Sequence, residues 1–452
     1  MKIAIISHTE HYLDSSGKIK GWGPTIKEIN KLAIVSNSIV HIAPFHKGNA
    51  PDSSLSYTVK NTNYLPLRPS GGQGLRKLSI LLNAPHNLFV IFKALKSVDF
   101  IQFRAPTGMG LYVLPFLRLF YNSKYWIKYA GNWKDEKMPF GNKLQKKWLQ
   151  NFTSKNTKIT VNGFWKNERN NIIPFENPCL DQNDRKLGRN ILVAKKLKKI
   201  VEFCFVGALN NHKGVDKILE ALKCLNSKDI KYIFHFVGDG PQRIDFEKTA
   251  KLLRFEIIFH GFLAKDAISN IYSRCDFIIL PSKSEGFPKV IGEAMNFGCI
   301  PIVSDVSCIS QYIQDGVNGF LIKPITSKEI TKKINLALNL TNSERLKIKK
   351  YGLLFFFTKL TACEHILNIF FKSLPSHSED FIPIDVTIFF TFLFNGCLTR
   401  IGEYTEYKLF SQIKRVGVCL TAARFMDSKK TPSSIAPSPK YTTERFFSFL
   451  FL

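Results

Sequence analysis

Short apolar runs alternate with amphipathic helical segments along the chain, and this alternation limits the possible fold more than any other feature. The first series of apolar runs reads "KIAIIS", "SIVHIAP", "VDFIQFRAP" and "KYWIKYAGNW". Apolar runs with helices between them are typical of parallel strands that are buried on both faces of a sheet. The segment that follows the first run, "SHTEHYLDSSGKIKGWGPTIKEINKLA", predicts a loop with Gly21 and Gly23 and then a helix.

A second series of the same kind follows a polar connection. The segment "VNGFWKNERNNIIPFENPCLDQNDRKLGRN" has the Asn, Pro and charge content of a link between domains. After it come "VEFCFVG", "YIFHFVG", "FEIIFHG", "DFIILPS" and "CIPIVSD", with "GFLIKP" as a late edge strand. We therefore expect an α/β protein with two Rossmann-like, doubly wound domains, residues 1–177 and 178–350, facing across a cleft.

The C-terminal part departs from this alternation. We expect residues 351–374 to form a closing helical segment and residues 375–452 to form an irregular tail. The tail mixes Phe runs, basic residues and Ser/Pro without a period, and its longest apolar stretch is too short to span a membrane. Two alternatives stay open for it: an interfacial anchor beside a basic surface, or a segment without regular structure, such as the product of a disrupted reading frame.

Net charge and cysteine content restrict the possible partners. The formal charge of +29 suits nucleic acid, an anionic membrane or a phosphorylated substrate, and it also fits the residue usage of an A/T-rich genome. The nine cysteines stand singly, without a C-x-x-C or paired His spacing, so neither disulfides nor a zinc site is indicated. The N-terminal apolar run is too short for a signal peptide, which favours a reducing cytoplasm.

The stretch "SEGFPKVIGEAMNFGCIPIVSD" carries the clearest candidate site. Pro288 and Gly298 predict a helix over residues 288–296, with free amide groups at its start. Glu285 lies just before this helix and Glu293 lies within it, so hydrogen-bond donors and carboxylates converge. This combination suits a polyhydroxylated ligand that carries phosphates. The alternative is that Glu285 only benefits from the helix dipole and that Glu293 is a solvated helix residue.

A set of ordered motifs resembles a known family. "FVGALNNHKGVDKIL", "VGDGPQ", "FHGFL", "LPSKSEGFPKVIGEAM" and "GCIPIVSD" are similar to the C-terminal half of the retaining GT-B glycosyltransferases of family 4, with their E-x7-E element. The first half, with "FRAPTGMGL" and "KYAGNW", is similar to bacterial members that build surface polysaccharides. The resemblance covers residues 1–372 and says nothing about the tail.

The resemblance implies roles for the matching residues. The catalytic pair is Glu285, which holds the donor sugar, and Lys213, which neutralises the leaving diphosphate. A lysine beside a helix N-terminus is otherwise unfavourable, and a bound anion would explain Lys213. Phe262 and Leu263 lie beside the base or, alternatively, are plain core. The donor-binding residues implied are Gly207, Phe262, Leu263, Gly286, Phe287, Pro288, Lys289, Val290 and Glu293, the last of which holds the ribose.

The sequence also departs from the family pattern. Ala208 stands where many relatives have an arginine, and Lys283 or Arg104 is the candidate for the second positive charge. Asn132 occupies a region where many relatives have a histidine. Gly21 and Gly23 belong to a loop that lets the backbone approach donor or acceptor, or else to a simple strand-to-helix turn. No D-x-D motif is present, so we expect no metal and no cofactor.

The expected function is transfer of a sugar from a UDP- or GDP-linked donor to a glycan or lipid-linked acceptor in surface polysaccharide synthesis. The expected partners are the nucleotide-sugar, this acceptor and an anionic membrane surface near "KLQKKW" and "VAKKLKK", but not nucleic acid. The expected location is cytoplasmic, peripheral at the inner face of the plasma membrane. Two alternatives are a sugar-nucleotide epimerase of the same fold and a non-catalytic scaffold.

Overall fold

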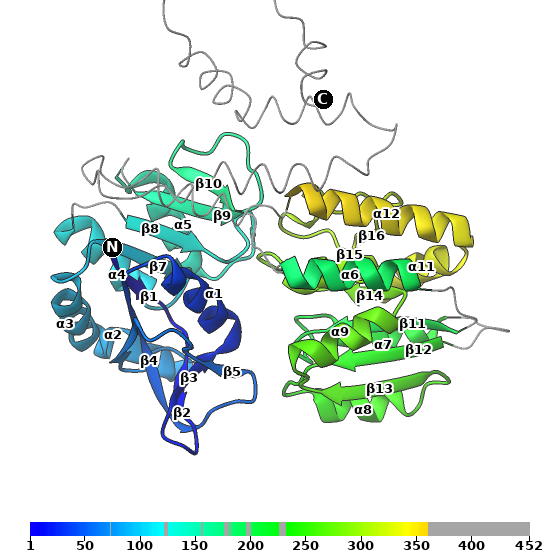
Figure 1. Cartoon of the computed structure of the whole chain (residues 1–452), viewed down its shortest axis with the longest axis horizontal. Helices are drawn as coiled ribbons and strands as arrows, with labels where there is room; N and C mark the ends of the chain where they lie inside the picture. Colours follow the sequence, from blue (N-terminus) through cyan, green and yellow to red (C-terminus); the bar gives the residue numbers. More distant parts are fainter. Residues whose placement is uncertain are drawn as a thin grey trace, which may run out of the picture. The chain divides into compact units, whose positions relative to one another are not determined.

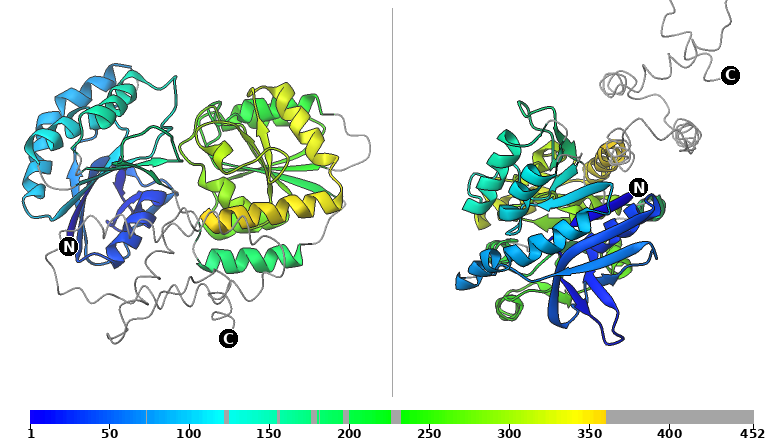
Figure 2. Two further views of the ribbon diagram at one scale, coloured as in Figure 1. Left: turned by 90° about the horizontal axis from the view of Figure 1, so that it is seen from above. Right: turned by 90° about the vertical axis from the view of Figure 1, so that its left-hand side faces the viewer.

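The computed structural model describes residues 1–72, 74–121, 125–154, 157–175, 180, 182–195, 200–225 and 232–359. The chain divides into two units, Met1–Leu374 and Pro375–Leu452, and all described residues lie in the first. The expected boundary at residue 177, most of the closing segment and the whole tail lie outside the described residues. We call residues 1–175 the N-half and residues 180–359 the C-half (Figures 1 and 2).

The N-half is built on a 10-stranded sheet. Its parallel part runs in the order β6-β4-β1-β7-β8-β9-β10, so that β1 lies between β4 and β7. The strands of this sheet are β1 (Lys2–Ile6), β2 (His11–Leu13), β3 (Ile19–Trp22), β4 (Ser38–Asn49), β5 (Ser54–Ser56), β6 (Thr62–Leu67), β7 (Phe100–Ala105), β8 (Tyr125–Tyr129), β9 (Lys158–Asn162) and β10 (Ile172–Phe175).

Helices cover both faces of this sheet, because side chains along β1 alternate between two cores (Figure 2). Ile3 and Ile5 pack under α1, whereas Ala4 and Ile6 pack under α3, α4 and α5. The helices of the N-half are α1 (Gly23–Ile34), the 3₁₀ helix η1 (Gly74–Leu78), α2 (Ser79–Leu82), α3 (Ala84–Leu95), α4 (Gly110–Phe120) and α5 (Phe140–Asn151). The Rossmann-like prediction for the N-half is confirmed.

The prediction of an irregular loop after β1 is wrong. This segment contains β2 and β3, which form an antiparallel hairpin, and β5 extends the hairpin on the other side of β3. Gly21 lies in β3, where an added Cβ would lie 2.6 Å from the His11 ring. Gly23 is the first residue of α1, and an added Cβ there would clash with the Ser53 carbonyl. Close packing inside the N-half therefore accounts for both glycines.

A buried network of His and Tyr side chains ties the hairpin to the main sheet. The Tyr57 hydroxyl is hydrogen-bonded to His11 Nε2 at 2.8 Å and to His41 Nδ1 at 2.6 Å. His41 Nε2 is in turn hydrogen-bonded to the Ser7 hydroxyl at 2.8 Å. Burial lowers the pKa of His11 to about 4 and lowers that of His41 well below its usual value. Both rings are therefore neutral in the folded protein near pH 7.

The C-half has a 6-stranded sheet in which all neighbouring pairs are parallel, in the order β13-β12-β11-β14-β15-β16. This order is that of a Rossmann fold, and β16 is the edge strand, as predicted. The strands are β11 (Val201–Val206), β12 (Tyr232–Val237), β13 (Glu256–Gly261), β14 (Phe277–Leu280), β15 (Ile300–Ser304) and β16 (Phe320–Ile322).

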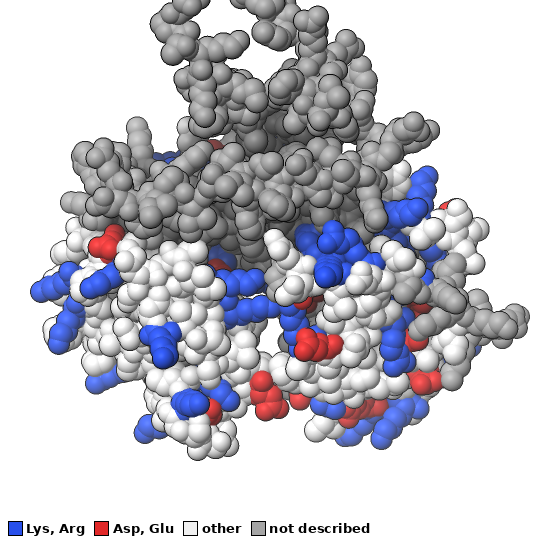
Figure 3. All heavy atoms as spheres, in the orientation of Figure 1, with Lys and Arg blue, Asp and Glu red and all other residues white. Residues whose placement is uncertain are grey.

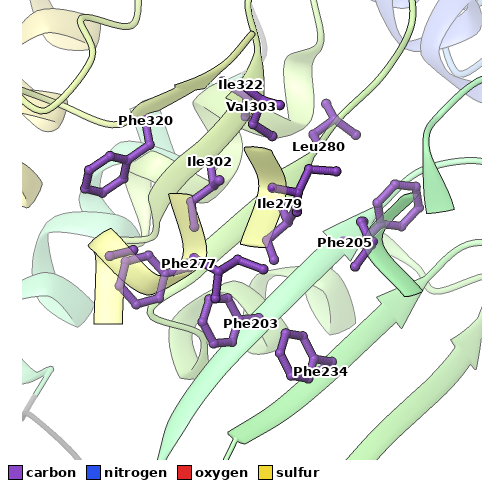
Figure 4. Packing of buried hydrophobic residues seen from close by; sticks show 14 of the residues in the cluster. Phe203, Phe205, Phe234, Phe277, Ile279, Leu280, Ile302, Val303, Phe320 and Ile322 are labelled. Atoms are coloured by element: carbon purple, nitrogen blue, oxygen red, sulfur yellow. The ribbon is translucent and has the colours of Figure 1, made fainter. Parts of the chain in front are cut away.

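Aromatic side chains dominate one face of this sheet. The Phe203 ring stacks on Phe234 with centroids 4.8 Å apart and on Phe277 with centroids 5.1 Å apart. Figure 4 shows Phe203 between these two rings. α7, α8 and α11 pack on this face, and α9 packs on the other face over Cys204 and Val237. The helices of the C-half are α6 (Gln182–Ala194), α7 (Val215–Lys223), α8 (Arg243–Ala250), α9 (Lys265–Arg274), α10 (Lys289–Asn296), η2 (Ile309–Gln311), α11 (Ser327–Leu338) and α12 (Asn342–Lys359).

Candidate active site

Two loops meet at the carboxyl edge of the C-half sheet, one after β11 and one after β14. Gly214 has φ +77° and caps α7, and an added Cβ would clash with the Pro281 carbonyl. Two residues beyond Pro281, the Lys283 amide donates to the His212 carbonyl at 2.9 Å. The glycine is required because it combines a left-handed conformation with a close backbone approach. The two loops therefore run side by side.

This arrangement brings the two expected catalytic residues together. Lys213 Nζ donates to Glu285 Oε1 at 2.5 Å, across a sequence separation of 72 residues. The Lys213 side chain is 27% exposed and the Glu285 side chain 9%. The sequence analysis expected a bound anion to compensate Lys213 beside the α7 N-terminus. In the structure, the Glu285 carboxylate supplies this negative charge.

Helix α10 begins one residue later than predicted. Pro288 has ψ 99°, which is extended, so it is the N-cap residue and Lys289 is the first helical residue. No side chain caps this end of α10, which leaves the first amide groups of the helix for other acceptors. Gly298 follows the helix with φ +76°, which confirms it as the terminator.

Glu293 lies one turn inside α10 and faces several lysines. Burial raises its pKa, and the positive charges of Lys289, Lys27 and Lys265 oppose this rise. Among the described residues, the structure gives the Glu293 carboxylate no hydrogen bond and no ion pair. Lys27 belongs to α1 of the N-half, so charges from both halves act on this carboxylate. A carboxylate in this state is suited to accept hydrogen bonds from a ligand.

The loop between Glu285 and α10 lies against the N-half. An added Cβ on Gly286 would clash with the Ala130 carbonyl, which follows β8. The Ser284 hydroxyl donates to Asp135 Oδ2 at 2.9 Å. A substrate held at α10 would therefore lie close to the loops that end the N-half strands, including Asn132, whose side chain accepts from the Lys134 amide at 3.1 Å.

The remaining donor-side residues divide into packing and exposed positions. An added Cβ on Gly238 would clash with the Gly207 carbonyl, so the two strand ends approach closely, and this contact requires the glycine at position 238. An added Cβ on Gly207 would meet only the Phe205 ring, at 3.4 Å. Leu263 packs against the core cluster under α9, as the core alternative predicted for it. The Phe262 side chain is 47% exposed, so that alternative is wrong for Phe262. Phe287 packs edge-on against Tyr312, with centroids 5.0 Å apart.

The sequence analysis missed a buried ion cluster in the N-half. Glu28 of α1 pairs with Arg104 of β7 at 2.8 Å and with Lys128 of β8 at 2.7 Å. Burial opposes the charge on Glu28, but Arg104, Lys128 and Lys289 outweigh it and hold its pKa well below its usual value. Burial lowers the pKa of Lys128 to about 8. The available signal was Lys128 itself, a lysine inside an apolar strand.

This cluster changes the assignment of the second positive charge. Arg104 is 12% exposed and is committed to Glu28, whereas Lys283 is exposed and Lys289 lies at the start of α10. Ala208 leaves no cation at its own position. Lys283 and Arg104 were the two candidates for the second positive charge, and of these only Lys283 is accessible to a ligand. Lys289 is a further candidate, because it lies at the start of α10.

One group of possible metal ligands lies at the opposite, amino edge of the C-half sheet. Ligand atoms of Glu202, His235 and Cys275 lie within 4.8 Å of one another, and all three residues are buried. Glu202 already pairs with His235 at 3.1 Å and with Arg274 at 3.2 Å. These contacts account for the carboxylate without an ion, and no spacing in the sequence indicated the group.

Part of the chain matches a known family. Residues 189–354 match the model of the family described as Glycosyl transferases group 1. An uncharacterized glycosyltransferase of Haemophilus influenzae is 30% identical over 194 residues, which are 41% of this chain and 52% of that protein. The lipopolysaccharide 1,2-N-acetylglucosaminetransferase of Salmonella typhimurium is 29% identical over 33% of this chain and 42% of its own length. The chain thus spans about half or less of the length of these relatives.

Solved structures share the fold over more of the chain. Sucrose-phosphate synthase from Thermosynechococcus elongatus aligns with a TM-score of 0.60 at 17% identity, covering 83% of this chain and 100% of that one. Anabaena HepE in complex with UDP aligns with a TM-score of 0.55 at 16% identity, covering 81% of this chain and 100% of that one. The fold is therefore GT-B, and residues 189–354 are similar to glycosyltransferases.

Proposed function

We propose that the chain is a retaining glycosyltransferase that moves a sugar from a nucleotide-sugar to a glycan or lipid-linked acceptor. The observation that carries this proposal is the contact between Lys213 and Glu285 beside the uncapped start of α10. A cation, a carboxylate and free amide groups meet there, which are the groups needed to hold a diphosphate and sugar hydroxyls. The glycosyltransferase group 1 match over residues 189–354 supports the same reaction class.

The donor lies along α10 in this proposal. Its diphosphate contacts the amides at the start of α10 and draws the Lys213 ammonium away from Glu285. Glu285 then accepts from the sugar hydroxyls, and Glu293 accepts from the ribose hydroxyls. Phe262 lies beside the base. Lys289 or Lys283 supplies the second positive charge, in place of the arginine that Ala208 lacks.

Transfer takes place on one face of the sugar. The bond between the anomeric carbon and the diphosphate oxygen breaks, and a bond from the anomeric carbon to the acceptor oxygen forms. The proton of the acceptor hydroxyl passes to the departing diphosphate, so no carboxylate nucleophile is needed. Lys213 stabilises the negative charge that develops on the leaving group, an interaction worth several kcal/mol in a site that excludes water. No metal is required in this scheme, because fixed cations neutralise the diphosphate.

The acceptor is proposed to belong to surface polysaccharide synthesis at the inner face of the plasma membrane. Support for a polysaccharide acceptor comes from the Salmonella relative, whose name places it in lipopolysaccharide synthesis. Support for a uridine nucleotide comes from HepE, whose structure holds UDP. A peripheral position at an anionic membrane agrees with the formal charge of +29.

A panel of UDP- and GDP-sugars, with and without EDTA, tests the proposal by release of nucleotide diphosphate. We expect release from one donor, unchanged by EDTA, and a loss of about 100-fold in Lys213→Met. Lys217→Met is the matched control, because Lys217 lies on the nearby helix α7 in an exposed pair with Glu220. Interconversion of the sugars would instead support an epimerase. Equal activity of Lys213→Met and Lys217→Met would contradict the proposed site, and absence of both release and binding would leave a scaffold.

A further inference from the structure

We propose that one face of the N-half docks onto an anionic lipid bilayer. This face, the α2–α4 surface, is formed by η1, α2, α3 and the C-terminal turn of α4. It deepens the proposed function, because it names the surface through which the chain would reach a lipid-linked acceptor. Four observations carry the proposal: exposed apolar side chains, their continuity, the charge around them, and their connection to the carboxyl edge of the sheet.

Large apolar side chains on this face are exposed to an unusual degree. Leu75 is 86% exposed, Leu82 77% and Phe120 71%. The other exposed apolar residues of the surface are Leu78, Leu81, Phe89, Phe92 and Leu119. Single exposed apolar residues are normal on soluble proteins, but a contiguous group of this kind marks an interaction site.

The exposed residues form one continuous surface. α3 packs beside α4, and α2 packs beside α3. The Phe92 ring contacts Phe116 with centroids 6.4 Å apart, and Phe116 contacts Phe120 at 5.4 Å. These rings link the exposed face of α3 to the end of α4. An occupant of the surface would therefore contact both helices at once.

The charge around the apolar residues is almost entirely positive. Apart from Arg104, which is committed to Glu28, residues 74–121 contain five Lys or Arg and a single acidic residue, Asp99. Asp99 already accepts from the Lys2 backbone amide at 2.7 Å. Lys96 Nζ lies 4.8 Å above the Phe92 ring, the position of a lysine whose stem covers apolar surface while its charge stays in water. Figure 3 shows that Lys and Arg are also more widespread than Asp and Glu on the face seen there.

This combination fits a bilayer surface better than a folded protein. A protein partner of a basic surface needs matching carboxylates at fixed positions, whereas anionic headgroups are mobile and accept any basic arrangement. Within the described residues, no single helix has the length and apolar character to cross a bilayer, and only the bent pair Gly74–Leu82 and Ala84–Leu95 passes such a test jointly. Short apolar helices flanked by Lys and Arg are suited to lie in the interface instead.

The α2–α4 surface adjoins the carboxyl edge of the N-half sheet. Gly108 lies in the loop after β7, and an added Cβ there would lie 2.8 Å from the Ile80 Cδ1 atom of α2. Arg104 of the Glu28 cluster is near the end of the same strand. A bilayer bound to α2 would therefore lie next to the loops at this edge, where a lipid-linked acceptor could reach them.

Co-sedimentation of the full chain with vesicles tests the inference. One set of vesicles is pure phosphatidylcholine, and the other contains phosphatidylcholine with 40% phosphatidylglycerol. We expect sedimentation with the anionic vesicles only and release at high salt. The triple variant Leu81→Ser/Leu82→Ser/Phe89→Ser should lose about tenfold or more in partitioning, because its exposed apolar side chains no longer enter the interface.

The matched control is Ile244→Ser/Leu252→Ser, which removes exposed apolar side chains from the C-half. It should sediment like the wild type, and thermal unfolding should be the same for all three proteins. Sedimentation of the triple variant at the wild-type level would overturn the inference and would place membrane binding in another basic segment or in the tail. Absence of wild-type sedimentation would overturn it as well.

Release of nucleotide diphosphate in solution without vesicles separates this inference from the proposed function. The triple variant should release nucleotide at the wild-type rate with a water-soluble acceptor or with water. If no protein releases nucleotide but the wild type still binds anionic vesicles through the α2–α4 surface, the proposed function fails and the docking surface stands.

Discussion

The two halves of the chain share a Rossmann-like sheet but hold their charged groups in different ways. In the N-half, Glu28, Arg104 and Lys128 come from one helix and two neighbouring strands and are mostly removed from water. In the C-half, Lys213 and Glu285 lie on two loops, and the lysine keeps more contact with solvent. A buried cluster in which two cations share one carboxylate cannot easily exchange partners, whereas a loop pair at an uncapped helix can.

This difference predicts that the N-half cluster acts mainly on stability and the C-half pair mainly on catalysis. Removing a charge from the N-half cluster should mainly lower the free energy of unfolding, because the remaining charges stay buried without compensation. Removing a charge from the C-half pair should mainly lower the rate of transfer. The following substitutions test that contrast when both the stability and the activity of each variant are measured.

The largest expected effect is on stability in the N-half. Glu28→Gln should lower the free energy of unfolding by about 3–5 kcal/mol, because Arg104 and Lys128 lose their counter-charge in a buried site. Urea denaturation at pH 7 measures this loss. Glu220→Gln removes a carboxylate from an exposed pair on α7 and should cost less than about 1 kcal/mol. Similar losses for the two variants would show that the cluster does not stabilise the N-half.

Acid should destabilise the N-half through its neutral histidines. The folded pKa of His11 is lowered to about 4, so the unfolded chain binds a proton at higher pH than the folded chain does. The contribution of His11 is complete above about pH 6.5 and is lost as the pH falls towards 4. The loss amounts to about 3 kcal/mol.

Urea denaturation between pH 7 and pH 4 checks this prediction when the wild type is compared with His11→Gln. Carboxylates elsewhere titrate in both proteins, so the difference between the two pH profiles isolates His11. The wild type should lose more stability than the variant over this range. Parallel profiles would mean that His11 is solvated in the folded state.

In the C-half, Glu285→Ala should act on catalysis. We expect a loss of about 1.5–3 kcal/mol in transition-state binding, because charged hydrogen bonds to the donor sugar disappear. This corresponds to a decrease in kcat/KM of roughly 10- to 150-fold. The free energy of unfolding should change by less than about 1 kcal/mol, because Lys213 can turn to solvent.

Kinetics with the donor identified by the panel measure the effect of Glu285→Ala. Glu247→Ala is the control, because it removes a carboxylate from an exposed pair with Arg243 on α8. Near-normal turnover of Glu285→Ala would remove Glu285 from the site. A large loss of stability in that variant would contradict the contrast between the two halves.

The smallest expected effect concerns the base of the donor nucleotide. Phe262→Ala should weaken nucleotide binding by about 1 kcal/mol or less, because one exposed aromatic face is lost. Its stability should stay unchanged, since nearly half of the side chain already contacts water. Isothermal titration with the nucleotide diphosphate measures the affinity, and Leu252→Ala is an exposed apolar control. Unchanged affinity of Phe262→Ala would place the base elsewhere.

Several elements were predictable because their signals are local. The strands of the C-half are mostly apolar, and Gly298 ends α10 by a conformation that only a few residues adopt easily. The hairpin of β2 and β3 was missed because its strands are short and mix polar with apolar residues. Three or four residues do not distinguish a strand from a loop by periodicity. The start of α10 was predicted one residue too early, at Pro288. The fixed φ angle of proline suits both the N-cap and the first helical position, so it does not distinguish them.

The candidate site was predictable only in part. The E-x7-E stretch is contiguous, so its two carboxylates and its helix could be located together. The Glu28 cluster was missed because its residues are up to 100 positions apart and nothing in the sequence links them. A lysine within the apolar run of β8 is a signal of a buried counter-charge, but the sequence does not say which residue supplies it.

The sequence alone determined the parallel strands of the two sheets and the motif at the start of α10, because periodicity and turn residues act over a few neighbouring positions. It did not show that the polar segment expected to link the halves contains β10 and the beginning of α6. Only the tertiary structure decided that Lys213 pairs with Glu285, that Gly286 lies against Ala130 and that the apolar residues of α2 and α3 stay exposed. Ion pairing, close contact and burial depend on distance in space. Sequence separation does not fix that distance once a chain has folded back on itself.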